Sequence, residues 1–166
     1  GVSNKALTVT GGAGTDTITG SAGNDTLKGG GGVDTFAMTN KLTYEDTIDG
    51  GEGTDVLTVS AAIDDVDFMN VSNVETLDLT PQASALAVGL GSYFNSSGLT
   101  KVVLNGSDKS TITATGTTTG VTYELTAAAI DEDITAGQGD DIFLVDQAAR
   151  VTAADIINGG AGTDTI

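Results

Sequence analysis

The 166-residue chain contains no cysteine, no histidine, no tryptophan and only one proline. Without histidine or cysteine it can form no Ser-His-Asp triad, no Cys-His pair, no imidazole or thiolate zinc site and no disulfide. Aromatic residues make up 4% of a chain that is 39% hydrophobic, so its apolar volume comes from small and β-branched side chains. No apolar run approaches the roughly 18 residues of a membrane-spanning helix. The metal ligands that remain to the chain are therefore mainly oxygen atoms. We expect that the chain is not an enzyme.

Charge of one sign dominates, because 23 acidic residues face 6 basic ones and the net charge is −17. Such a charge opposes binding to nucleic acid and to anionic membrane surfaces, and its self-repulsion disfavours a compact state. Two interpretations stay open at this point: a fold stabilised by bound cations, or an acidic surface that serves solubility. We expect neither a nucleic-acid partner nor insertion into a membrane.

A nonapeptide recurs along the chain, three times without a gap and three times more at a distance. Its copies begin at Gly11, Gly20, Gly29, Gly50, Ala136 and Gly159. The sixth position of each copy is an aspartate: Asp16, Asp25, Asp34, Asp55, Asp141 and Asp164. An apolar residue occupies the eighth position, where it can point into a core. Successive glycines permit positive φ and a tight turn rich in carbonyls. The aspartate adds a carboxylate, and Ca²⁺ binds six to eight such oxygens.

These copies resemble the calcium-binding nonapeptide of RTX proteins. The resemblance implies an all-β fold, a right-handed parallel β-roll or β-solenoid in which two nonapeptides complete one coil and Ca²⁺ lies between stacked turns. It places Asp16, Asp34 and Asp55 on one edge of the roll and Asp25 on the other.

The same resemblance implies three ion sites. The first lies between the turn with Gly11, Ala13 and Asp16 and the turn with Gly30, Gly32 and Asp34. The second lies between Gly29, Gly31 and Asp34 and the turn with Gly51, Gly53 and Asp55. The third lies between Ala136, Gln138 and Asp141 and the turn with Gly160, Gly162 and Asp164. The remaining candidate ligands are Asp25, Asp46 and Asp155. The stretched copy at 41–49 keeps only Asp46 and an apolar eighth residue, which weakens the case for an ion between Asp25 and Asp46.

The middle of the chain, residues 60–126, has no nonapeptide but does have strand patterns. Alternating segments predict strands within 71–80, 100–104, 110–115 and 121–126, and short helical turns or loops are expected within 61–69 and 83–97. Pro81 is expected to end the first strand. We divide the chain into an RTX segment (1–59), a threonine-rich strand segment (60–130) and a second RTX segment (131–166). Whether the middle strands continue the axis of the roll or form a separate lobe stays open.

Two acidic clusters fall outside the repeat. One contains Asp64, Asp65 and Asp67, and the other contains Asp131, Glu132 and Asp133. Neither has the central glycine and distal glutamate of an EF-hand. We interpret both as solvated charge.

Residues 70–79 and 98–104 resemble strand repeats of RTX-type bacterial surface-layer (S-layer) proteins; the alternative is any threonine-rich linker of a β-solenoid. The S-layer resemblance implies a structural, calcium-dependent protein that is secreted to the bacterial cell surface. RTX relatives leave by type I secretion. Self-association into a surface lattice is then expected, with cell-surface polysaccharide contacted through another region. The chain starts without methionine and stops inside a motif, so we expect it to be a piece of something longer. The rival hypothesis is the calcium-binding segment of a secreted protease, lipase, toxin or large adhesin whose active domain lies outside this chain.

Overall fold

The computed structural model describes residues 4–39, 41–79, 85–104, 109–126, 132–145 and 153–166. These residues form short strands and two short helices. The strands are β1 (Thr8–Ala13), β2 (Thr17–Thr19), β3 (Thr26–Gly31), β4 (Thr35–Thr39), β5 (Thr47–Glu52), β6 (Val56–Val59), β7 (Val71–Ser72), β8 (Thr76–Asp78), β9 (Ala87–Gly89), β10 (Lys101–Leu104), β11 (Thr111–Thr113), β12 (Thr122–Leu125), β13 (Asp133–Thr135), β14 (Ile142–Val145) and β15 (Ile156–Asn158). The 3₁₀ helix η1 spans Asp65–Phe68, and the helix α1 spans Ser92–Ser97.

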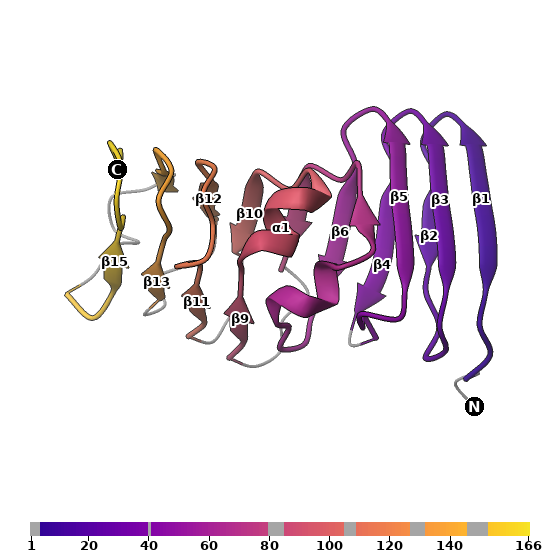
Figure 1. The fold of residues 1–166 in the computed structure, drawn as a ribbon, viewed down its shortest axis with the longest axis horizontal. Helices are drawn as coiled ribbons and strands as arrows, with labels where there is room; N and C mark the ends of the chain where they lie inside the picture. Colours follow the sequence, from indigo (N-terminus) through magenta and orange to yellow (C-terminus); the bar gives the residue numbers. More distant parts are fainter. Residues whose placement is uncertain (1–3, 40, 80–84, 105–108, 127–131, 146–152) are drawn as a thin grey trace.

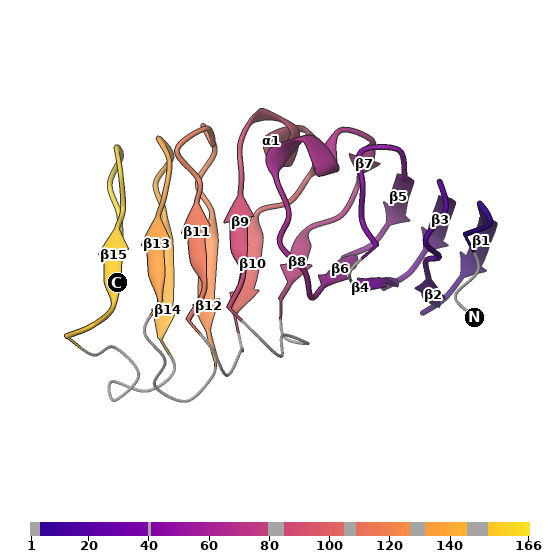
Figure 2. The same cartoon turned by 90° about the horizontal axis from the view of Figure 1, so that it is seen from below.

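The strands wind into a parallel β-solenoid, which confirms the predicted all-β fold. A long sheet has the order β14-β12-β10-β8-β6-β4-β2, and two shorter sheets have the orders β1-β3-β5-β7 and β15-β13-β11-β9. Every pair of neighbouring strands is parallel. Strands of successive coils lie side by side along the long axis of the molecule, and the two termini lie at opposite ends (Figures 1 and 2). Consecutive odd and even strands therefore belong to different faces of one coil.

The register of the long sheet aligns one apolar column inside the solenoid. Its members, in the order of the coils, are Ile18, Phe36, Leu57, Leu77, Val102, Tyr123 and Phe143. All seven are buried, and the rings of Tyr123 and Phe143 stack with centroids 5.2 Å apart. The eighth position of the nonapeptide thus points inward, as predicted, except at Ile166, which is exposed. Leu27, Ile48 and Ile134 of the shorter sheets are buried in the same core, so inward side chains from both faces hold the sheets together.

The middle of the chain continues the same solenoid. The long sheet runs through β6, β8, β10, β12 and β14 without interruption, and it therefore crosses all three segments that the sequence suggested. Short helical turns occur where they were expected, as η1 and α1, which lie next to each other over the middle coils (Figure 1). Phe68 and Phe94 meet there edge to face, with ring centroids 5.7 Å apart. Pro81 lies outside the described residues. No helix among those that are described is long and apolar enough to span a membrane.

Candidate metal centre

Glycines at the second and fourth positions of four nonapeptides adopt positive φ. They are Gly12, Gly14, Gly30, Gly32, Gly51, Gly53, Gly160 and Gly162, with φ between 85° and 138°. Side chains rarely tolerate this backbone conformation, so these positions require glycine. The turns at 11–16, 29–34, 50–55 and 159–164 therefore share one backbone shape.

The copy at 136–141 does not share this shape, although its sequence fits. Neither Gly137 nor Gly139 has positive φ. Gly137 packs instead against the preceding coil, where a Cβ would overlap the Thr117 hydroxyl and lie 2.5 Å from the Thr117 carbonyl oxygen. Thr117 is fully buried, and its carbonyl accepts a hydrogen bond from Gln138 N at 3.0 Å. The neighbouring coil, which lacks a glycine turn of its own, thus alters this turn.

A ladder of carboxylates runs along one edge of the solenoid, just before the strands of the long sheet; we call it the first edge. The Asp16 amide donates to Asp34 Oδ1 at 2.8 Å, and the Asp34 amide donates to Asp55 Oδ1 at 2.7 Å. The Asp55 amide donates to Glu75 Oε2 at 2.7 Å. The predicted alignment of the three aspartates on one edge is confirmed. The structure adds Glu75, which the sequence analysis did not select.

The opposite, second edge also carries a carboxylate ladder. The Leu7 amide donates to Asp25 Oδ1 at 2.8 Å, and the Asp25 amide donates to Asp46 Oδ1 at 2.9 Å. Here the second carboxylate oxygens have donors too: Asp25 Oδ2 accepts from Ser21 N at 2.6 Å, and Asp46 Oδ2 accepts from Thr43 N at 2.9 Å. A cation between Asp25 and Asp46 would compete with these hydrogen bonds.

The first edge differs because its second carboxylate oxygens have no donor. Within the described part of the chain, Oδ2 of Asp34, Asp55 and Asp141 is buried without a hydrogen-bond partner. Such an atom loses its hydration without compensation. A cation is the partner that a buried carboxylate oxygen can bind in place of an N–H group.

In the turns of Asp34 and Asp55, a backbone carbonyl of the next coil lies close to the free Oδ2 at the first glycine of the turn. A Cβ built on Gly29 would overlap Asp34 Oδ2 and lie 2.5 Å from the Gly50 carbonyl oxygen. A Cβ on Gly11 would lie 2.5 Å from Asp16 Oδ2 and 2.6 Å from the Gly29 carbonyl oxygen. Carboxylate and carbonyl oxygens from consecutive coils therefore converge over a residue without a side chain. This donor set suits Ca²⁺.

Negative charge on the first edge is poorly compensated. Burial is the main cause that raises the pKa of Asp55, and the nearby Asp34, Glu75 and Asp49 raise it further. Burial likewise raises the pKa of Asp141. No three acidic side chains among the described residues converge on one point, so carbonyl oxygens have to supply many of the ligands. A divalent cation would favour the ionised carboxylates that burial disfavours.

The last two predicted turns also come together on the first edge. The Val121 amide donates to Asp141 Oδ1 at 2.8 Å, and the Asp141 amide donates to Asp164 Oδ1 at 3.0 Å. The Ala161 amide donates to the Gly137 carbonyl at 2.9 Å. Ala136 is buried, whereas the side chain of Gln138 is exposed. The structure thus brings the two halves of the third predicted site into adjacent coils.

The prediction that the cluster around residue 132 is solvated is wrong for Glu132, which is 2% exposed. Its Oε2 accepts from Ser110 N at 2.8 Å, and its own amide donates to Asp155 Oδ1 at 2.7 Å. Burial raises the pKa of Glu132 to about 7. Asp133 pairs instead with Lys109 at 2.9 Å, and Asp131 lies outside the described residues. Glu132 and Asp155 therefore form a ladder ahead of the second short sheet.

One spacing rule finds every ladder residue, including the two that were missed. Each acidic member stands two positions before an apolar residue, which points inward in every case but that of Asp164 and Ile166; Glu75 stands so before Leu77, and Glu132 before Ile134. A search restricted to glycine and aspartate overlooks the glutamates. The longer side chain reaches the same amide of the preceding coil.

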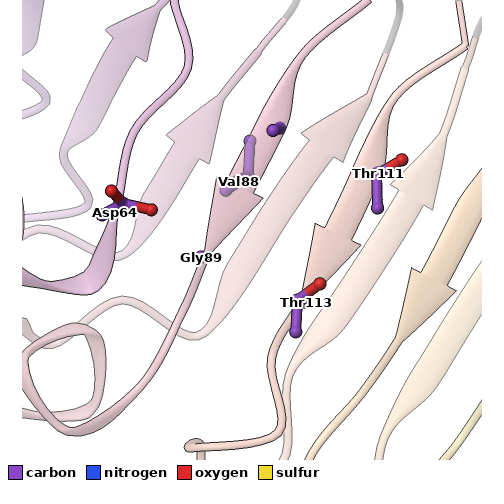
Figure 3. A pocket seen from close by; sticks show the side chains of 6 residues that line it. Asp64, Val88, Gly89, Thr111 and Thr113 are labelled. Carbon is purple, nitrogen blue, oxygen red and sulfur yellow. The ribbon is translucent and has the colours of Figure 1, made fainter.

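The other acidic cluster supports the helices. Asp64 is exposed, as predicted, but Asp65 accepts from the amides of Tyr93 at 3.2 Å and Phe94 at 2.9 Å at the start of α1. Asp64 also borders a surface cavity of about 290 Å³. The residues that line it are Asp64, Ala87, Val88, Gly89, Thr111 and Thr113. Figure 3 shows Asp64 on one side of this cavity and the two threonines of β11 on the other. Of the residues that the structure describes, only Asp64 lines this cavity with an acidic side chain, and it belongs to neither ladder.

Comparison with known protein families identifies the turns. The family model of the RTX calcium-binding nonapeptide repeat matches the chain in four copies, over residues 8–37, 42–66 and 152–166. These ranges contain the four turns with positive-φ glycines, but neither the turn at 136–141 nor Glu75. No curated protein and no solved structure matches the chain significantly.

Proposed function

We propose that this chain is a structural segment of a secreted bacterial protein that folds and assembles when it binds Ca²⁺. The RTX repeats imply a calcium-binding segment of a secreted protein. The observation that carries the proposal is the free buried oxygen of one nonapeptide aspartate, Oδ2 of Asp34, on the first edge. This oxygen and the Gly50 carbonyl of the next coil converge over Gly29, where the two can bind one cation.

Calcium binding and coil stacking depend on each other in this arrangement. Because one ligand comes from each of two consecutive coils, an unfolded chain has no complete site. Binding energy is then folding energy. A free Ca²⁺ concentration of 100 times the dissociation constant stabilises the fold by about 2.7 kcal/mol per site. Low cytosolic Ca²⁺ would leave the chain unfolded for export, and millimolar Ca²⁺ outside the cell would fold it.

The reduction of net charge by bound Ca²⁺ also favours folding. Three bound Ca²⁺ ions would change the net charge of −17 to about −11. Weaker self-repulsion favours the compact state.

We further propose that the secreted protein is a surface-layer component, exported by type I secretion, whose copies associate into a lattice on the cell surface. Support comes from the two segments that resemble S-layer strand repeats, 70–79 and 98–104. Their strands β8 and β10 are neighbours in the long sheet, with Thr76 opposite Lys101. The repeats thus follow one another as consecutive coils. Contact with cell-surface polysaccharide would use another region of the protein.

The alternative is that this is the calcium-binding segment of a secreted protease, lipase, toxin or adhesin. It is favoured by the extent of the family match, which covers nonapeptides and leaves residues 67–151 unmatched. The activity would then reside outside this chain. Electron microscopy of the full-length protein with Ca²⁺ distinguishes the two, because a two-dimensional lattice is expected only of a surface-layer protein.

Circular dichroism tests the calcium dependence directly. We expect a disordered spectrum in chelator and a β spectrum after Ca²⁺ is added in excess, whereas Mg²⁺ at the same concentration should have a smaller effect because it prefers a rigid octahedral site. Identical spectra with chelator and with Ca²⁺ would contradict the proposal.

A further inference from the structure

The first-edge ladder continues beyond the last of its three stacked nonapeptides. After the turn at 50–55 the next coil has only a short connection between β7 and β8. The register of β5 with β7 pairs Ile48 with Val71 and Asp49 with Ser72, so Asn73 follows in line with Gly50. Glu75 then stands opposite Asp55 and accepts its amide hydrogen bond at 2.7 Å. This connection is much shorter than a nonapeptide turn, yet it keeps an acidic residue at the ladder position.

The arrangement of oxygens seen between nonapeptides recurs at this boundary. A Cβ on Gly50 would overlap both Asp55 Oδ2 and the Asn73 carbonyl oxygen. At Gly29 the corresponding atoms are Asp34 Oδ2 and the Gly50 carbonyl oxygen. Asp55 is 0% exposed, and its Oδ2 has no hydrogen-bond partner within the described structure. The free oxygen of Asp55 thus points forward, toward the coil that contains Glu75.

The backbone conformation of Asn73 directs its carbonyl toward Asp55 Oδ2. Its φ is 52°, in the left-handed region that asparagine tolerates better than most residues. Its side-chain amide donates to Asp49 Oδ1 at 2.8 Å. The carbonyl therefore has a fixed position opposite Asp55 Oδ2.

Neither carboxylate is neutralised by a lysine in the part of the chain that the structure describes. Lys101, which lies opposite Thr76 on the next coil, pairs with Glu124. Asp55 and Glu75 take part in no ion pair there. Two adjacent carboxylates thus remain without a positive partner.

We propose that a further divalent-cation site lies between the Gly50–Asp55 turn and the Asn73–Glu75 connection, with Asp55 Oδ2, the Asn73 carbonyl and the Glu75 carboxylate as protein ligands. The proposal rests on the calcium-binding function proposed above. Water molecules complete the ligand set, since Ca²⁺ binds six to eight oxygens. The site joins the last glycine turn of the stack to the coils of the middle segment.

The test replaces Glu75 by glutamine. Glu75→Gln removes the charge but keeps an oxygen that can accept the Asp55 amide hydrogen, so it separates a cation site from a purely structural hydrogen bond. The matched control is Glu45→Gln, because Glu45 is exposed and outside both ladders. Equilibrium dialysis with radioactive Ca²⁺ counts the ions bound per chain.

We expect Glu75→Gln to bind one Ca²⁺ fewer than the unmodified chain and Glu45→Gln to bind the same number. Equal numbers for both variants would overturn this site while leaving the proposed function intact. A chain that binds no Ca²⁺ at all would overturn both. If Glu75→Gln fails to fold, a crystal structure of the unmodified chain with Ca²⁺ decides: an ion between Asp55 and Asn73 supports the site, and its absence there refutes it.

Discussion

The amide of Asp34 donates to Oδ1 of Asp55 at 2.7 Å, while Oδ2 of Asp34 itself is buried and has no partner. The ladder thus uses one oxygen of each carboxylate for the backbone and leaves the other for a cation. On the second edge both oxygens of Asp25 accept hydrogen bonds from protein groups. The two edges therefore differ in what their carboxylates can still bind.

Asparagine substitutions on the two edges should separate these roles. Asp34→Asn keeps an acceptor for the Asp16 amide but removes the charge, so we expect Ca²⁺ affinity to fall by roughly tenfold or more, about 1.4 kcal/mol for each factor of ten. Asp25→Asn should disturb the hydrogen bonds to Ser21 and change Ca²⁺ affinity little. Isothermal titration calorimetry measures both. Equal losses would contradict the distinction between the edges.

An alanine scan of one turn should show where side chains are excluded. In Gly29→Ala the new Cβ would collide with Asp34 Oδ2 and the Gly50 carbonyl, so we expect weaker Ca²⁺ binding and a loss of about 1–3 kcal/mol. Gly31→Ala is the control, because nothing lies within 4 Å of a Cβ there and its φ is not positive. Chemical unfolding in Ca²⁺ gives both stabilities. If Gly31→Ala loses as much stability as Gly29→Ala, a collision with the oxygens that converge over Gly29 does not explain the loss.

Glu132 should make stability depend on pH. Its folded-state pKa of about 7 exceeds the ordinary value of 4.5, so between these values the folded chain holds a proton that the unfolded chain has released. The stability contribution is therefore present below pH 4.5 and is lost as the pH rises through 7. Glu132→Gln should be more stable than the unmodified chain at pH 8 and similar to it at pH 4.5.

Denaturant midpoints in saturating Ca²⁺ at the two pH values test this prediction. The difference between variant and unmodified chain removes the pH effects of the other carboxylates, which the two share. A difference that stays constant with pH would show that the pKa of Glu132 is the same in the folded and the unfolded chain.

Tyr123 carries a buried hydroxyl that no described group bonds. Burial raises the pKa of this phenol, and the nearby Asp141 raises it further. Tyr123→Phe keeps the ring stacked on Phe143 and removes the unsatisfied group. Because leaving such a group buried costs about 1–3 kcal/mol, we expect the variant to be at least as stable as the unmodified chain in thermal unfolding. A clear loss of stability would mean that the hydroxyl is bonded.

The resemblance of the nonapeptide to the RTX repeat was sufficient to predict the coil and the two edges, and its apolar eighth position predicted that residues such as Phe36 point inward. This succeeds because glycine, aspartate and an apolar residue at fixed spacing each satisfy a local requirement of the turn or strand. Local spacing also located the strands around Leu77 and Val102, but not their path. That path depends on parallel pairing between residues 20 or more positions apart, such as Val102 with Tyr123.

Two predictions were wrong because they considered each turn without the coil that precedes it. Glu132 looks like solvated charge in sequence, but the amide of its neighbour in the preceding coil, Ser110, draws its carboxylate inside. The glycines at 137 and 139 have the sequence of a left-handed turn but pack on the coil that contains Thr117. In a solenoid the shape of a turn is decided partly by the coil beneath it.

The forward direction of the first-edge ladder gives the molecule a polarity. A coil placed after Asp34 brings both the acceptor for its amide, Asp55 Oδ1, and the carbonyl of Gly50 that faces its free oxygen. The coil before it contains Asp16 and supplies neither of these atoms. It supplies instead the Asp16 amide, which donates a hydrogen bond to Asp34 Oδ1. The contacts of each coil are thus completed by the coil that follows it, and the two ends of the stack differ, as the two ends of a polar filament do.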